Sequence, residues 1–482
     1  MAGFPFDGRL ESRALAREHR PASKISRDLQ PLVDLNPGSA VSIIIQTSSA
    51  PARSLLSSLD NLNGVIHRSY ANLNSIAVQL PAAAVTALSR RHDVSFISLD
   101  RTARAAGHIE VTSGASQARS YSLSSSSPIN GSGVGIAVID SGIDPSHASF
   151  RAGNSASRII ANIDFTGEAR TDDPHGHGTH VASLAAGSTQ LANGAYAGIA
   201  PAANLINVRV LDSTGRGSMS SVIAGIDWCI SNRLAYNIRV LNLSLGTAPV
   251  DSYINDPVCQ AVRRAVDAGL VVTVAAGNHG KDSEGNKLYG AIHSPGIEPS
   301  AITAGAANSF GTDSRSDDAV ATYSSRGPTR SFYTDGSGAR RYDNLIKPDL
   351  IAPGNRLIAA KAPNNLLVTN NPALDASTSS DPARGMMYMS GTSMAAPIVA
   401  GAAALLLQRN PALTPNLVKA LLQYTAQPVA GFSTVEQGAG LLNIEGAVRL
   451  AGLVRRDLSG RSNGDALLSS ASPAQISTIA GG

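Results

Sequence analysis

The feature that most constrains the fold is a series of short, almost uninterrupted runs of Val, Ile and Leu. Four such runs lie at residues 133–140, 204–211, 238–245 and 270–277. A run without polar alternation predicts a strand that is buried on both faces. Because segments with helical spacing separate these runs, the pattern is typical of a parallel sheet covered by helices. We therefore predict an α/β fold with a mostly parallel central sheet flanked by helices.

The segments between and after these runs complete the prediction for the larger part of the chain. Helices are expected at residues 179–187, 220–230, 258–268, 398–407 and 418–424. Residues 331–343 and 363–386 are polar and irregular, and we predict inserted loops there.

A smaller unit precedes this one. Strands are predicted at residues 41–46, 75–80 and 94–100, helices at 52–62 and 81–91, and there is room for one more strand near 63–70. This order predicts a small α+β, ferredoxin-like domain. The expected organisation is a polar leader at 1–39, a first domain at 40–108, a second domain at 109–452 and a flexible Ser/Gly/Ala-rich tail at 453–482.

Composition excludes several classes of function. Hydrophobic residues make up 43% of the chain and charged residues 15%, which is enough for a large core. The net charge is only +4 and the basic residues are scattered, so no nucleic-acid partner is expected. No apolar run reaches the roughly 18 residues that a transmembrane helix needs. We therefore expect no membrane span.

The cysteines and the N-terminus bear on the compartment. Cys229 and Cys259 show no metal-ligand spacing, and either one disulfide bridge or two reduced thiols fits the sequence. The first twenty residues lack the apolar region of a secretory signal. Either the protein stays inside the cell or a signal segment has been removed ahead of this sequence.

Polar side chains follow the buried runs where chemistry collects in parallel sheets, beyond the carboxyl ends of the strands. Asp140 closes the first run, Ser244 follows the third and Asn278 follows the fourth. A single Asp at a strand end is more often an ordinary turn or cap residue than a catalytic one. The other segments must decide its role.

A histidine-rich segment, D-P-H-G-H-G-T-H-V-A, spans residues 173–182. Glycines flank His177 and allow its imidazole to lie in a tight turn before a helix. The spacing of His175, His177 and His180 also raises the alternative of a zinc site. The H-E-x-x-H arrangement is missing and the cysteines are distant in sequence, so no metal site is predicted here.

Ser393 lies among small residues in G-T-S-M-A-A-P-I-V-A-G, just before an apolar helix. A serine there is either a helix cap or a nucleophile, because free N–H groups at a helix start favour an anion. Asp, His and Ser are the three side chains of an acyl-transfer site. The amide of Asn278, with the Ser393 N–H, could stabilise the oxyanion.

Six segments, in this order along the chain, resemble those of subtilisin-like serine proteases, the subtilases of peptidase family S8. They are residues 138–144, 177–182, 275–278, 323–328, 347–354 and 391–397. The resemblance covers about residues 109–452. It implies a subtilisin-like fold and a serine endopeptidase that cleaves polypeptide substrates through an acyl-enzyme. Asp140, His177 and Ser393 would form the triad, Asn278 the oxyanion hole, and no cofactor would be required for chemistry.

The resemblance also implies where an extended substrate would lie. The residues expected to contact it are Gly217, Met219, Ser244, Leu245, Gly246, Ala276, Gly277 and His293. Met219 either lines a pocket for a substrate side chain or only packs against neighbouring side chains of the protein. His293 stands where the family commonly has a small residue. It either shortens the specificity pocket and adds a polar partner, or points away.

Residues 40–108 resemble the inhibitor-I9-type propeptide of this family, which implies an autoprocessed zymogen whose own propeptide acts as intramolecular inhibitor. The cut is expected near Gly107 and His108. Secretion is the leading expectation and a cytoplasmic location the alternative. Where the family's usual calcium site has an acid, this chain has Ser149. That site is not expected, and another structural calcium site stays open.

Two other functions fit parts of the pattern. One is a catalytically silent subtilase-like scaffold for binding, and the other is an esterase with the same triad. A silent scaffold need not keep all four of the residues named for triad and oxyanion hole. Extended substrate strands and a pro-segment favour peptides over esters.

Overall fold

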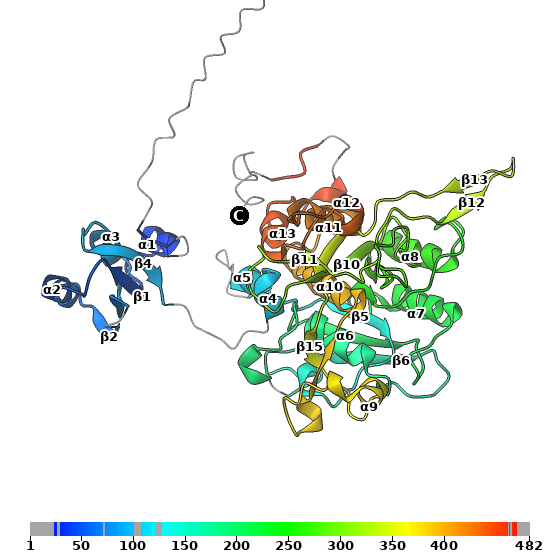
Figure 1. The fold of residues 1–482 in the computed structure, drawn as a ribbon, viewed down its shortest axis with the longest axis horizontal. Coiled ribbons are helices and arrows are strands. Elements are labelled where there is room, and N and C mark those ends of the chain that lie inside the picture. The colour runs from blue at the N-terminus through cyan, green and yellow to red at the C-terminus, as the bar shows by residue number, and fades with distance from the viewer. Residues whose placement is uncertain are drawn as a thin grey trace, which may run out of the picture. The chain divides into compact units, whose positions relative to one another are not determined.

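The computed structural model describes residues 24–469, except 27–28, 71–72, 101–107, 121–127, 154, 461 and 463–464. The described residues up to 100 form one compact unit, and those from 108 onward form another (Figure 1). Most of the predicted leader, residues 101–107 just before the expected cut, and the end of the predicted tail lie outside the described residues.

The first unit has a four-stranded antiparallel sheet in the order β2-β3-β1-β4. Its elements are β1 (Ala40–Thr47), α2 (Arg53–Asn61), β2 (Val65–Tyr70), β3 (Ser75–Pro81), α3 (Ala84–Ser89) and β4 (Val94–Leu99). This is the β-α-β-β-α-β arrangement of the ferredoxin-like fold. One buried cluster contains side chains from β1 and from both helices, among them Ile43, Leu55 and Val85.

The first unit begins earlier than Ala40. A short helix, α1 (Gln30–Leu35), lies within the segment predicted as a polar leader. Leu29 and Val33 are buried in the same cluster as the sheet, and the backbone N–H of Ser26 donates to the carbonyl of Ile97. The prediction of a leader up to residue 39 was wrong there. One helical turn and a half is too short to show a clear apolar period.

The second unit contains a sheet in the order β11-β10-β9-β8-β5-β7-β6, with β14 paired to β10. Its strands are β5 (Gly135–Asp140), β6 (Ile159–Asp164), β7 (Asn204–Arg209), β8 (Ile238–Leu243), β9 (Val271–Ala275), β10 (Ile302–Asn308), β11 (Ala319–Val320) and β14 (Leu350–Pro353). All pairings are parallel except that of β10 with β11. The predicted mostly parallel sheet is confirmed.

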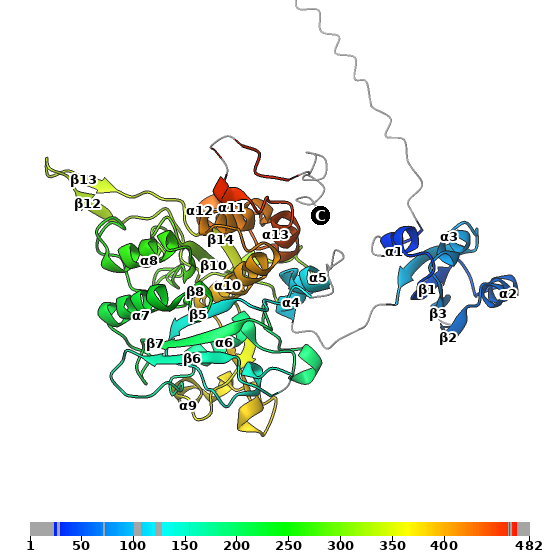
Figure 2. The same cartoon turned by 180° about the vertical axis from the view of Figure 1, so that it is seen from behind.

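Helices cover both faces of this sheet (Figures 1 and 2). One face packs against α7 (Met219–Asn232) and α8 (Pro257–Asp267). The other face packs against α6 (His177–Ala186), α10 (Thr392–Arg409), α11 (Pro415–Thr425) and α13 (Ile444–Ala451). A short helix, α12 (Thr434–Gln437), precedes α13. The apolar helix predicted after Ser393 is thus the buried α10.

The start of the second unit packs against its last helix. The segment contains α4 (His108–Thr112) and α5 (Ala115–Ser120), and its apolar residues Ile109, Ala115 and Ala118 are buried in the cluster that contains α13. The backbone N–H of Ile444 donates to the carbonyl of Ser113 at 2.9 Å. Residues 108–120 are therefore part of the core of this unit.

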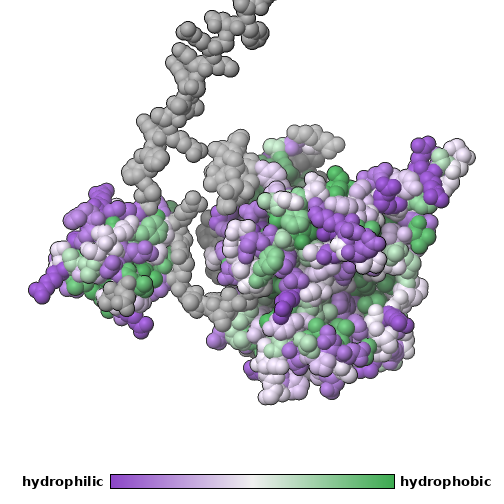
Figure 3. All heavy atoms as spheres, viewed as in Figure 1, coloured by the Kyte–Doolittle hydropathy of each residue, from purple (hydrophilic) through white to green (hydrophobic). Residues whose placement is uncertain are grey.

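Several regions predicted as irregular have structure. Residues 331–343 contain a hairpin of β12 (Phe332–Thr334) and β13 (Arg340–Tyr342), which extends from the body of the unit and has a largely hydrophilic surface (Figures 1 and 3). Residues 363–386 contain α9 (Leu366–Asn370). The start of β16 (Met386–Met389), which pairs with β15 (Leu357–Ala360), also falls there. In the predicted tail, Val454 is buried and pairs with Leu468.

Cys229 and Cys259 lie on α7 and α8 as buried, free thiols. The structure thus decides the open question of a bridge in favour of two reduced residues. Burial raises the pKa of both thiols. Among the described residues, no helix combines the length and the apolarity needed to cross a lipid bilayer.

Candidate active site

Asp140 and His177 meet where β5 ends and α6 begins. Asp140 is fully buried, and its Oδ1 atom lies 2.7 Å from Nδ1 of His177. The same oxygen accepts the backbone N–H of Ser141 at 2.8 Å. Because Nδ1 is engaged with the carboxylate, the other ring nitrogen of His177 is available to the pocket that this residue lines.

Gly178, next to His177, lets the start of α6 approach the loop after β5 closely enough for the contact between Asp140 and His177. A β-carbon added to Gly178 would lie 2.2 Å from the carbonyl oxygen of Gly142. Gly178 therefore lets the first turn of α6 contact the loop that follows β5. In the H-G-T-H pattern, the first histidine thus serves the chemistry, and the glycine is needed because a side chain would not fit.

A second buried acid, Asp173, fixes the start of α6. Its carboxylate accepts the Ser141 hydroxyl at 2.8 Å and the backbone N–H groups of Gly176 and Thr179, each at 2.7 Å. The Ser141 hydroxyl in turn accepts the N–H of Gly178 at 3.0 Å. Burial raises the pKa of Asp173, and these donors oppose that shift. Asp173 is a positioning residue that the sequence analysis did not identify.

The balance of burial and charge sets the basicity of His177. Burial lowers its pKa, but the charge and hydrogen bond of Asp140 outweigh that effect, so the pKa lies above its ordinary value of 6.5. An imidazole with this pKa binds a proton more readily than one in water. It is suited to act as a general base.

The neighbouring histidines have other environments. The ring of His180 is fully buried, with Nε2 3.2 Å from the carbonyls of Leu357 and Met387, and burial lowers its pKa to about 3. His175 lies 6.2 Å from His177 between ring centres, and burial lowers its pKa too. His180 is thus a structural residue that faces backbone carbonyls, whereas His175 and His177 line the pocket.

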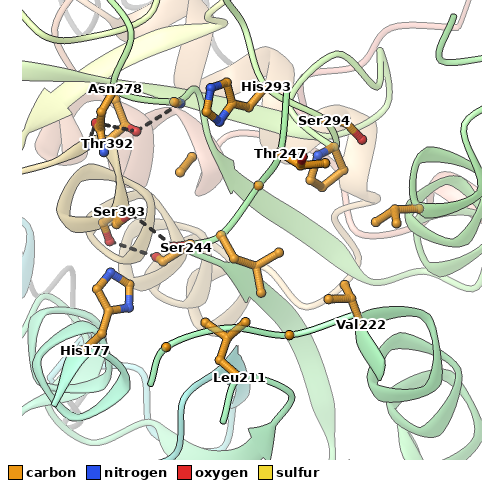
Figure 4. Close-up of a pocket in the computed structure, with 18 of the residues that line it drawn as sticks. His177, Leu211, Val222, Ser244, Thr247, Asn278, His293, Ser294, Thr392 and Ser393 are labelled. Atoms are coloured by element: carbon orange, nitrogen blue, oxygen red, sulfur yellow. Dashed lines mark hydrogen bonds between the residues drawn. The ribbon is translucent and has the colours of Figure 1, made fainter. Parts of the chain in front are cut away.

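Ser393 is the second residue of α10 and exchanges hydrogen bonds with Ser244. Its hydroxyl donates to the carbonyl of Ser244 at 3.0 Å, and the Ser244 hydroxyl donates to the carbonyl of Ser393 at 2.8 Å. A hydroxyl has one hydrogen, so the Ser393 proton is directed at Ser244 in this state. Figure 4 shows Ser393, Ser244 and His177 on the same side of the pocket.

The side chain of Asn278 is oriented by Thr392. Its Oδ1 atom accepts the backbone N–H of Thr392 at 2.9 Å and the Thr392 hydroxyl at 3.1 Å. That hydroxyl also accepts the N–H of Gly277 at 3.0 Å. Because the amide oxygen is engaged, the Asn278 NH₂ group is left as the donor that can face a ligand. Thr392 is the second positioning residue that the sequence analysis did not identify.

Most of the residues predicted to contact substrate surround one cavity of about 390 Å³. Those that line it with His177, Asn278 and Ser393 are Gly217, Met219, Ser244, Leu245, Gly246, Gly277 and His293. Ala276 is fully buried, and its carbonyl accepts the N–H of His293 at 2.9 Å. Asp140 is not among the residues that line this cavity; it contacts His177, which does line it.

The surroundings of Ser149 do not fit a calcium site. The guanidinium of Arg158 donates to the carbonyls of Ser149, Ala186 and Ala203 at 2.8, 2.6 and 2.7 Å. Arg158 is buried, which lowers its pKa to about 10. A cationic side chain among three carbonyl oxygens leaves no coordination position there for a second cation.

Known proteins resemble the chain over most of its length. The model of the Subtilase family matches residues 131–448. Serine protease AprX of Bacillus subtilis is 37% identical over 379 residues, which cover 76% of this chain and 77% of that protein. Subtilisin E of the same species is 32% identical, over 83% and 87% of the two chains. An extracellular serine proteinase of a Thermus species is 33% identical, over 74% and 72%.

Proposed function

The chain belongs to the subtilase family and is a serine protease; from this premise we propose that Asp140, His177 and Ser393 are its catalytic triad. The observation that carries the proposal is the 2.7 Å contact between the buried Asp140 and Nδ1 of His177, which lines the same pocket as Ser393 at the start of α10. Subtilases need no cofactor for catalysis, so these side chains must supply the chemistry.

The proposed reaction begins when the Ser393 hydroxyl turns from the carbonyl of Ser244 toward His177. The imidazole takes the proton as Oγ attacks the carbonyl carbon of the substrate. The resulting oxyanion accepts hydrogen bonds from the Asn278 NH₂ group and the Ser393 N–H. His177 then gives its proton to the leaving amine, and water hydrolyses the acyl-enzyme in a second round.

The experiment that tests this assignment compares wild type with Ser393→Ala on casein. Loss of the nucleophile lowers kcat by about 10⁶-fold. Ser390→Ala is the matched control, because Ser390 is an exposed serine three residues away. Labelling by a fluorophosphonate gives a second readout. Equal labelling or equal activity of Ser393→Ala and wild type would refute the nucleophile.

We also propose that the first unit, predicted as residues 40–108 and beginning before Ala40 in the structure, is a propeptide, removed by the enzyme itself near Gly107 and His108. The support is a first unit with its own buried core and a second unit whose own core begins with Ile109. Time-resolved intact mass should show wild type losing about the first hundred residues, while Ser393→Ala stays full length. A wild type that keeps its full mass and digests casein would contradict this zymogen model.

Secretion is the location that we propose, with the cytoplasm as the alternative. It is supported by the similarity to the extracellular Thermus proteinase. Fractionation of the producing cells, with activity and antibody detection in medium and lysate, tests it. Mature enzyme confined to the lysate would favour the alternative.

A further inference from the structure

The lining of the pocket beside Ser393 includes two histidines that contact each other. Nδ1 of His279 lies 2.8 Å from Nε2 of His293, and the ring centres are 4.8 Å apart. In Figure 4 His293 lies across the pocket from His177. The backbone N–H of His279 is itself fixed by the hydroxyl of Ser325 at 3.0 Å.

The backbone around His293 is tied to both walls of the pocket. His293 donates its N–H to the carbonyl of Ala276 at 2.9 Å, which joins it to the segment that carries Asn278. The next residue, Ser294, exchanges two backbone hydrogen bonds with Thr247, at 2.9 and 3.0 Å. His293 is therefore held between the two chain segments that form the walls.

The imidazole of His293 occupies space that glycines leave open. A β-carbon added to Gly277 would lie 2.7 Å from Cγ of His293, and one added to Gly246 would lie 3.2 Å from Cβ of His293. A real β-carbon essentially never approaches so closely as the first of these distances. Both walls thus lack a side chain where this residue stands, and the ring fills the gap.

A second cavity, open to solvent, also borders the pair. It has a volume of about 330 Å³, and its lining includes His279 and His293 themselves. Its apolar lining includes Val250, which is 80% exposed, Leu288, which is 37% exposed, and Phe332. The two histidines are thus shared between this cavity and the catalytic one of about 390 Å³. The imidazole of His293 is thus part of the wall of both spaces.

We infer that the His279–His293 pair is a partition at one side of the specificity pocket beside Ser393, so that the enzyme cleaves after small side chains. The inference rests on the proposed function, since it concerns the residue just before the bond that Ser393 attacks. A methyl or hydroxymethyl side chain fits in front of the partition, whereas an aromatic ring meets the imidazole. With the partition removed, the ring would extend toward the apolar side chains of the second cavity.

The test uses two chromogenic peptides that differ only in the residue before the scissile bond, alanine or phenylalanine. Wild type should have a kcat/KM at least tenfold higher for the alanine substrate. His293→Gly should shift the ratio by at least tenfold toward phenylalanine. Lys281→Gly, an exposed position on the same loop, is the matched control and should keep the wild-type ratio.

A second variant tests the inference independently in case His293→Gly does not fold. His279→Ala keeps the backbone of His293 and removes the ring that supports it, so the ratio should move in the same direction by a smaller factor. An unchanged ratio in either active variant, or a wild type that prefers phenylalanine, would overturn the partition. A wild type that cleaves neither peptide nor casein would instead refute the proposed function, and the inference with it.

Discussion

The hydroxyl of Ser244 donates to the carbonyl of Ser393, and the hydroxyl of Ser393 donates to the carbonyl of Ser244. This reciprocal pair joins the end of β8 to the first turn of α10. It holds the backbone of the proposed nucleophile against a wall of the pocket. It also gives the Ser393 proton a resting partner that must be exchanged for His177 before attack.

Ser244→Ala should therefore lower kcat with little change in KM. The variant loses one hydrogen bond to the backbone of Ser393, worth about 1 kcal/mol, or roughly fivefold in rate. The wall itself is backbone and stays in place. Steady-state kinetics on one peptide substrate measure the effect, with the exposed Ser132→Ala as control. A rise in KM at constant kcat would show that Ser244 acts on substrate binding instead.

Asn278 and Thr392 should behave as one unit. Asn278→Ala removes a donor to the oxyanion and should lower kcat by about 10²- to 10³-fold. Thr392→Val loses the hydroxyl that orients the amide, and should lower kcat by roughly fivefold, the worth of one hydrogen bond of about 1 kcal/mol. In the double variant, Thr392→Val should cause no further loss. Additive losses in this double-mutant cycle would mean that Thr392 does not act through Asn278.

The pH dependence of kcat/KM should report His177. The general base must be neutral, and its pKa lies above 6.5, so activity should be lost as the pH falls through a value above 6.5. Asp140→Asn removes the charge that raises this pKa while burial, which lowers it, remains. The acidic limb should move to lower pH, with kcat reduced by about 10⁴-fold. A limb that stays in place would show that another group titrates.

Arg158 should contribute to stability rather than to chemistry. Arg158→Met removes the guanidinium donor from the carbonyls of Ala186 and Ala203, whereas the carbonyl of Ser149 still accepts the N–H of Ser188 at 2.7 Å. A buried polar group that loses its partner costs about 1–3 kcal/mol. We expect the Tm to fall by several degrees. The melt is best recorded in the Ser393→Ala background, because self-digestion is then absent. Arg151→Met, an exposed arginine nearby, should melt like its parent.

The sequence predicted the centre of the sheet better than its edges. The strands β5, β7, β8 and β9 are runs of large aliphatic residues, and burial on both faces requires such runs. β10 was missed because I-T-A-G-A-A-N is made of small residues with low strand preference. These small residues have a packing role. Gly305 leaves no room for a β-carbon against Ile351 and Pro348.

The functional site was likewise predicted only in part from the sequence. Asp140, His177, Asn278 and Ser393 were named from motifs, and four residues of those types gather at one end of a parallel sheet for topological reasons. Asp173 and Thr392 were not named, because an acid or a threonine in a loop has many ordinary roles. Their function depends on contacts with partners that are up to 115 positions away in sequence. Only the folded chain shows those contacts.

The packing of residues 108–120 against α13 has a consequence for how the second unit is made. Within the second unit these residues are synthesised first, and α13, which covers them, follows the other described α-helices of the unit. The hydrogen bond from Ile444 to Ser113 joins positions separated by almost the whole unit, and such distant contacts slow folding. The core of the second unit therefore cannot close in the interval before α13 has been synthesised. During that interval Ile109 and its neighbours lack the surface that will bury them.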